Sequence, residues 1–166
     1  IANTSYTITA TTNVGYELKN WDTTINGTLS DASANPTNYT VTDEATLTAI
    51  GRTIPTFDTT VVLPANVLSV SFTHPAFPTQ TIDTSGGVVS LRRGIPYTIT
   101  ASFVDGYTID NWIAGPNSTL ESASSNPTNF TITDDTTLTL TSKEAVLSTY
   151  TLHYDAGDGT GAPDDD

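Results

Sequence analysis

Apolar and polar residues alternate in short stretches along this chain, and this is the pattern of half-buried β-strands. In residues 6–11, Tyr, Ile and Ala alternate with threonine, and residues 97–101 show the same order. Turn signals such as Asn13-Val-Gly15 separate the stretches. The segment 30–35, which ends before a proline, is compatible with one short helical turn. We therefore expect an all-β fold with at most one short helical turn in each unit.

The alternating pattern is duplicated after 91 positions without a gap. Residues 6–52 and 97–143 are identical at 24 of 47 aligned positions. Apolar positions exchange conservatively between the copies, as Tyr39 and Phe130 do, whereas charged positions such as Glu17 change freely. Because cores accept only side chains of similar volume, the comparison separates expected core from expected surface. The duplication predicts tandem small β-sandwich units.

The two copies differ in what precedes them. Further alternating stretches lie ahead of the second copy, at residues 68–72, 79–82 and 88–91. The first copy has no such stretches before it, so we expect its unit to lack its leading strands. The resulting scheme has four segments: an incomplete first unit over residues 1–52, a linker over 53–66 with one strand around Val61–Leu63, a complete second unit over 67–146, and the opening strand of a third unit with an acidic tail over 147–166.

Composition narrows the classes of partner. The net charge of −13, with only five Lys and Arg residues, opposes binding to nucleic acid and to anionic membranes. No segment approaches the roughly 20 apolar residues of a membrane helix, so membrane insertion is not expected. The absence of Cys excludes disulfides and thiolate sites. Low Lys with abundant Thr, Asn, Ser and Asp is typical of an extracellular or cell-surface location.

Several motifs of the repeat resemble one known family. They are Tyr-Thr-Ile-Thr-Ala at 97–101, Gly-Tyr at 106–107, Trp112, Asn-Pro-Thr-Asn-Phe-Thr-Ile at 126–132 and Thr-Leu-Thr at 137–139. In this order they resemble the divergent internalin-B-type B-repeat. Residues 150–163 look like the opening of the related Listeria–Bacteroides repeat. The resemblance implies small β-grasp-like modules of bacterial cell-surface proteins, often in tandem, that act as stalks or adhesive spacers and carry no catalytic residues.

The two tryptophans admit two interpretations. Trp21 and Trp112 could stack against sugars, or each could anchor the core of its unit. Both recur together with the apolar positions of the repeat, which favours the core. Trp21 also falls out of phase with the strand that contains it, so we expect a bulge or a strand end there.

Acidic and amide side chains supply the remaining candidate sites. Asp155 and Asp158 are weak candidates for calcium ligands, but a hairpin turn explains their spacing equally well. No other cofactor is expected. Asn-x-Ser/Thr sequons that glycans could modify stand at Asn26, Asn38, Asn117 and Asn129.

The function expected from these observations is not enzymatic. The only histidines, His74 and His153, lie in unrelated contexts, and no nucleophile motif accompanies them. The leading hypothesis is a structural module of a secreted or cell-surface protein, acting as a stalk or adhesive spacer, or as a subunit of a filament-like extracellular assembly linked head to tail by strand addition. Its partners would be neighbouring repeat units or copies of itself. The alternative is a carbohydrate- or receptor-binding module that contacts host glycans or receptors.

Overall fold

The structure is a computed structural model that describes residues 3–146, and these residues form fourteen β-strands and no helix. The all-β prediction is therefore confirmed within this range. The helical turn predicted for residues 30–35 is wrong, because the backbone amide and hydroxyl of Ser33 both donate to the Asp31 carboxylate, at 2.8 and 2.7 Å. Such local side-chain hydrogen bonds compete with helical ones and favour a turn.

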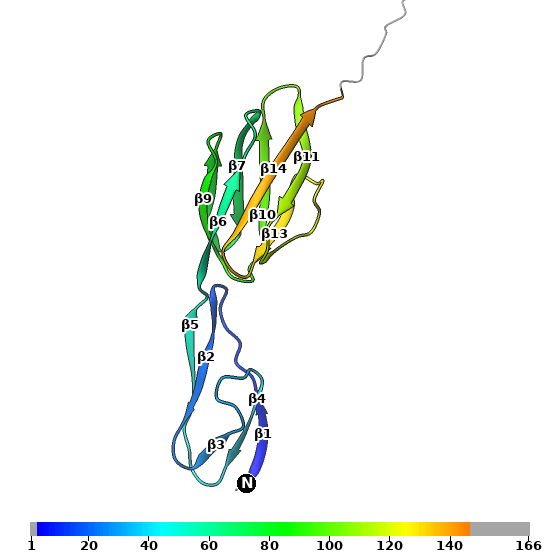
Figure 1. Ribbon diagram of the computed structural model, residues 1–166. Coiled ribbons are helices and arrows are strands. Elements are labelled where there is room, and N and C mark those ends of the chain that lie inside the picture. The colour runs from blue at the N-terminus through cyan, green and yellow to red at the C-terminus, as the bar shows by residue number, and fades with distance from the viewer. Residues whose placement is uncertain (1–2, 147–166) are drawn as a thin grey trace, which may run out of the picture.

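The second unit is a β-sandwich of two sheets (Figure 1). One sheet has the strand order β12-β13-β10-β7-β8, and the other has the order β11-β14-β6-β9. The strands are β6 (Thr56–Val62), β7 (Val67–His74), β8 (Phe77–Asp83), β9 (Gly87–Arg92), β10 (Tyr97–Phe103), β11 (Tyr107–Ala114), β12 (Ser118–Leu120), β13 (Thr128–Ile132) and β14 (Thr136–Glu144).

Alternating residues of both sheets fill one core between them. Burial of each large apolar side chain stabilises the unit by roughly 1.5–3 kcal/mol relative to exposure. The positions that the copy comparison marks as inward, such as Phe130 and Ile132, belong to this core. Its buried members are Val61, Val67, Val70, Phe72, Val89, Leu91, Tyr97, Ile99, Ala101, Trp112, Phe130, Ile132, Leu138 and Leu140.

The first unit contains the counterparts of β10 to β14 only. Its strands are β1 (Thr4–Ile8), β2 (Tyr16–Thr23), β3 (Gly27–Leu29), β4 (Thr37–Val41) and β5 (Leu47–Thr53). They form a sheet of order β1-β4-β3 and a pair β2-β5. Within residues 3–146, this unit has no counterpart of β6, β7, β8 or β9.

The segment expected to be a linker, residues 53–66, contains a central strand of the second unit. Instead of a short strand around 61–63, residues 56–62 form β6, which lies between β14 and β9 in its sheet. The side chains of Thr59 and Val61 are buried in the sandwich. Only Ile54 and Pro55 separate β5 from β6, and we call these two residues the connector.

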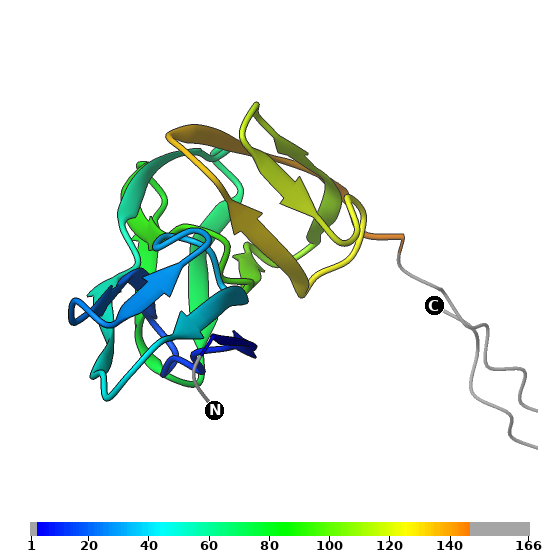
Figure 2. The ribbon, with the colours of Figure 1, turned by 90° about the horizontal axis from the view of Figure 1, so that it is seen from below.

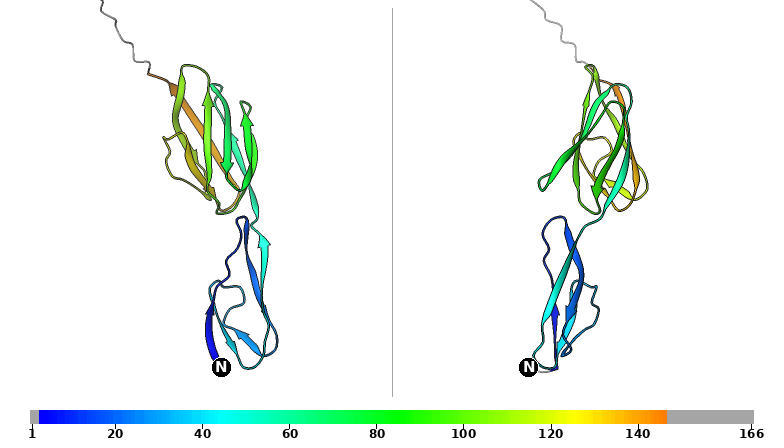
Figure 3. Two further views of the ribbon diagram at one scale, coloured as in Figure 1. Left: turned by 180° about the vertical axis from the view of Figure 1, so that it is seen from behind. Right: turned by 90° about the vertical axis from the view of Figure 1, so that its left-hand side faces the viewer.

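The two units follow one another along one long axis (Figures 1 and 3). The view along this axis places the first unit in front of the second (Figure 2). No helix within residues 3–146 is long and apolar enough to cross a membrane.

Candidate functional site

The first unit has two sheet edges that are paired in the second unit. β10 pairs with β13 on one side and β7 on the other, whereas its counterpart β1 pairs with β4 alone. β14 pairs with β11 and with β6, whereas its counterpart β5 pairs with β2 alone. One edge of each sheet of the first unit is therefore unpaired within the described residues, and both edges lie where β6 and β7 would add.

The missing pairing changes the strands of the first unit. In β10, residues 100–103 have β7 as their only strand partner, because the pairing with β13 ends at Ile99. The matching residues 9–12 of the first unit form no strand. Ala10 is held instead by Asn35, whose side-chain oxygen accepts from the Ala10 amide at 2.9 Å and whose nitrogen donates to the Ala10 carbonyl at 2.8 Å. This side chain is the partner that keeps the segment in place.

The same pair of side-chain hydrogen bonds, which we call the amide clamp, exists in the complete unit. The side-chain oxygen of Asn126 accepts from the Ala101 amide at 2.8 Å, and its nitrogen donates to the Ala101 carbonyl at 2.8 Å. The path of the chain at Ala10 is thus that of the complete unit, although the neighbouring strand is absent.

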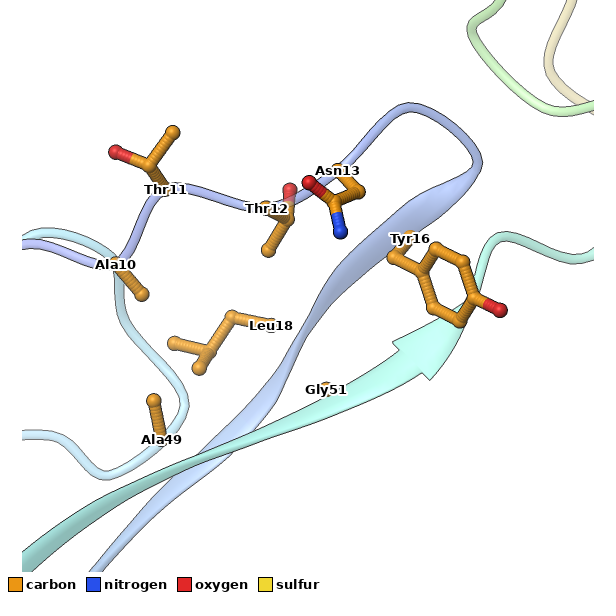
Figure 4. A pocket seen from close by; sticks show the side chains of 8 residues that line it. All are labelled: Ala10, Thr11, Thr12, Asn13, Tyr16, Leu18, Ala49 and Gly51. Atoms are coloured by element: carbon orange, nitrogen blue, oxygen red, sulfur yellow. The ribbon is translucent and has the colours of Figure 1, made fainter. Parts of the chain in front are cut away.

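A shallow apolar cleft of about 280 Å³ opens between residues 10–13 and the β2-β5 pair (Figure 4). The side chains of Leu18 and Ala49 point into it, and Tyr16 stands at its rim. At the position matching Ala49, the second unit has Leu140, which is buried in its core. The cleft therefore corresponds to one side of a sandwich core, and the strands that would cover it from the other side have no counterpart within the described residues. Its lining residues are Ala10, Thr11, Thr12, Asn13, Tyr16, Leu18, Ala49 and Gly51.

Both tryptophans are core residues, as the repeat pattern favours. Trp21 is 6% exposed and Trp112 is 2% exposed. Their indole nitrogens donate to the carbonyl oxygens of Ala34 and Ser125, each at 3.0 Å. The pairing register shifts just ahead of each tryptophan, which confirms the predicted bulge. The hypothesis that these two rings form sugar-stacking platforms is wrong, because neither ring face is accessible.

The four candidate glycosylation sites fall into two matched pairs. Asn26 and Asn117 donate their side-chain nitrogens to backbone carbonyls of the following acidic turns, at 3.0 and 3.2 Å. Asn38 and Asn129 are exposed, on β4 and β13. Asn117 is exposed as well, and the side-chain nitrogen of Asn129 donates to the Glu121 carboxylate at 2.8 Å, so accessibility does not rank the two pairs. Glycosylation at all four positions stays a prediction.

The candidate calcium ligands Asp155 and Asp158 lie outside the described residues. Within residues 3–146, no three acidic or histidine side chains are grouped to hold a metal ion.

An ion cluster at the junction of the two units was not foreseen from the sequence. Arg52 donates to one carboxylate oxygen of Glu17 at 2.8 Å, and Arg93 of the second unit donates to the other at 2.7 Å. Partial desolvation alone would raise the pKa of Glu17, but the hydrogen bonds and charges of Arg93 and Arg52 outweigh it and lower the pKa. Glu17 thus joins the two units while ionised.

An aromatic contact lies next to this ion cluster. The guanidinium carbon of Arg92 stands 4.9 Å from the centre of the Phe77 ring. A Cβ atom placed on Gly15, in the turn before β2, would lie 3.0 Å from the same ring. The tip of the first unit therefore packs closely against the β8–β9 region of the second.

One family profile, described as the Divergent InlB B-repeat domain, matches residues 2–50 and 77–145. The first range runs from β1 into β5, and the second runs from β8 to the last residues of the sandwich. β6 and β7 lie between the two ranges. Comparison with curated proteins and with solved structures gave no match. The resemblance of the repeat motifs to the divergent B-repeat is therefore confirmed. The resemblance of residues 150–163 to the Listeria–Bacteroides repeat, and the opening strand of a third unit predicted for 147–166, lie outside both the matched ranges and the described residues.

Proposed function

The chain belongs to the divergent InlB B-repeat family, and from this we propose that its two units form a rigid, load-bearing section of a stalk. The repeats of this family are non-catalytic structural repeats of bacterial surface and secreted proteins. A stalk must keep its domains folded under tension and limit the bending between them. The placement of strands and the contacts at the connector support both properties.

The observation that carries the proposal is the placement of the first and last strands of the second unit. β6 and β14 lie side by side and run parallel, with Thr136–Thr139 opposite Thr59–Val62 (Figure 1). Tension between the start of β6 and the end of β14 pulls these neighbours in opposite directions along their length. The hydrogen bonds between them are then loaded together in shear, so they resist more force than bonds that break one after another.

The connector transmits tension while fixed to both units. The Ile54 amide donates to the Gly15 carbonyl of the first unit at 2.9 Å. Its carbonyl accepts from the Arg92 side chain at 3.1 Å, and the Pro55 carbonyl accepts from the Arg93 amide at 3.0 Å. A connector of two residues that is bonded on both sides favours a stiff joint over a free hinge.

Pulling single molecules along two axes tests the proposal. The chain has no Cys, so handles at Pro55→Cys and Val146→Cys load β6 against β14 in shear. Handles at Ser85→Cys and Val146→Cys hold two points at the same end of the sandwich, since Gly87 pairs with Val61 and β14 runs parallel to β6. We expect a several-fold higher unfolding force for the first pair. Equal forces along both axes would contradict a load-bearing role.

The carbohydrate- or receptor-binding alternative now rests on exposed tyrosines. Tyr16, at the rim of the cleft, and Tyr107, at the matching position, are both exposed at the first residues of β2 and β11. Titration with oligosaccharides, followed by tyrosine fluorescence in the parent protein and in Tyr16→Ala, tests this function. Saturable binding that the substitution abolishes would support it.

A further inference from the structure

We propose that the open side of the first unit is a docking surface for a four-stranded segment of the same kind as β6–β9, supplied in the same polypeptide by a preceding repeat. The segment would add one strand to β1 and one to β5 and would close the sandwich over the cleft. This inference concerns the first unit, whereas the load-bearing proposal rests on the second, so each can fail without the other.

The open edges of the first unit match the edges that β6 and β7 cover in the second unit. β7 pairs with residues 98–103, which correspond to 7–12 in the first unit. β6 pairs with residues 136–139, which correspond to 45–48. Residues 9–12 and 45–46 are the parts of the first unit that do not form strands although their counterparts do. The structure is thus irregular where the proposed segment would pair.

The open side of the first unit retains an aromatic side chain that the second unit buries. In the second unit, Tyr97 is covered by the proposed kind of segment: its ring packs near His74 and Phe77, and its hydroxyl accepts from the Arg92 amide at 3.3 Å. Its counterpart Tyr6 is the same residue without these neighbours. Exposed apolar side chains next to unpaired strand edges are features that a covering partner would bury.

The chain enters β1 with the same backbone conformation with which it enters β10. Gly94, in the turn from β9 to β10, has a φ of 69°, and its amide donates to the Ile132 carbonyl at 2.7 Å. Asn3, at the matching position, has a φ of 62°, and its amide donates to the Val41 carbonyl at 2.8 Å. A left-handed conformation is uncommon for a residue other than glycine. The chain at Asn3 therefore follows the turn that a preceding β9-like strand requires.

This turn favours a segment in the same polypeptide over one from a second copy. β6–β9 of a second copy are already paired in its own sandwich, and their release would expose that core.

The proposal is tested by adding a β6–β9 segment directly ahead of the turn at Asn3. A second copy of residues 55–91, placed directly ahead of Ile1 in the full chain, preserves the 91-residue period. Hydrogen exchange of residues 9–12 is compared with that of residues 100–103. We expect exchange at 9–12 to slow at least about tenfold and to approach that of 100–103. Unchanged exchange at 9–12, with the added segment itself unprotected, would overturn the proposal.

A matched control separates docking from a general effect of the added chain. Val70→Asp and Phe72→Asp, made only in the added copy, remove its apolar face and should abolish the new protection. The parent chain supplies the remaining outcome. If it forms dimers in which residues 9–12 become protected as concentration rises, the occupant is a second copy, and the proposal is wrong.

Discussion

Tyr6 and Tyr97 occupy the same position in two copies of one repeat, yet Tyr6 is 45% exposed and Tyr97 is 3% exposed. Their neighbours in sequence are identical through the next four residues. The difference comes from β7, β8 and β9, which cover Tyr97 and have no counterpart over Tyr6 within the described residues. Comparing these two tyrosines therefore shows how much closure of the sandwich contributes to the burial of this position.

Truncation of the two tyrosines should have unequal effects. Tyr97→Ala leaves a cavity in the core and should lower the free energy of unfolding of the second unit by about 3–5 kcal/mol. Tyr6→Ala removes a half-exposed side chain and should cost the first unit about 1 kcal/mol or less. Urea unfolding checks this, with Trp21 reporting in a Trp112→Phe background and Trp112 in a Trp21→Phe background. Equal costs would show that the first unit is closed in solution.

The amide clamp on β10 should contribute to stability. Asn126→Ala removes both hydrogen bonds to Ala101 and should lower the free energy of unfolding of the second unit by about 1–3 kcal/mol. Asn126→Asp keeps the acceptor but places a carboxylate oxygen against the Ala101 carbonyl oxygen, so it should not recover the lost stability. The control is Asn129→Ala, which removes only solvent-exposed hydrogen bonds with Thr98 and Glu121 and should change stability by no more than about 0.5 kcal/mol. A clamp variant as stable as this control would contradict the assignment.

The ion cluster at the junction should order the two units in a pH-dependent way. The pKa of Glu17 is lowered in the folded protein, so its contribution is complete above its ordinary pKa and is lost as pH falls through the lowered value. Spin labels at Thr28→Cys and Thr119→Cys report the distance between the units. We expect the distribution to broaden in acid, and Glu17→Gln to broaden it already at pH 7.

Glu44→Gln supplies the control for this measurement, because Glu44 lies in an exposed turn of the first unit. It should leave the distribution unchanged. A narrow distribution in Glu17→Gln at pH 7 would show that the ion cluster does not hold the joint.

Two glycines with the same backbone conformation separate turn strain from junction packing. Gly15 and Gly106 both have a φ of 86°, so alanine at either should cost roughly 1–2 kcal/mol. A Cβ on Gly15 would lie 3.0 Å from the Phe77 ring, whereas one on Gly106 would have nothing within 4 Å. Only Gly15→Ala should therefore alter the inter-unit distance distribution. The same change in both variants would rule out a role for this contact.

Much of the fold follows from the duplication in the sequence. Tyr39 and Phe130, exchanged conservatively between the copies, lie in buried positions of β4 and β13. The phase break at Trp21 marks a bulge. The buried positions and the bulge are visible in a short stretch of sequence or recur in both copies. Comparing the two copies in one chain is therefore enough to predict them.

Features that depend on distant partners were missed. β6 follows a proline, has three threonines in seven residues and gains its place through parallel pairing with β14, more than 70 residues away. Glu17 is replaced by threonine in the second copy, and such a free exchange is typical of an exposed position. Its partner Arg93 lies 76 positions further along the chain. No local sequence pattern indicates the β6–β14 pairing or the Glu17–Arg93 ion pair.

Single-molecule pulling between residues 55 and 146 tests most directly whether β6 and β14 bear load together. Thr60→Pro removes a backbone donor from β6 opposite Thr137 and should markedly lower the unfolding force. Thr119→Pro disturbs the edge strand β12, outside the path of tension, and should leave the force close to that of the parent protein. Equal losses of force in both variants would contradict the claim.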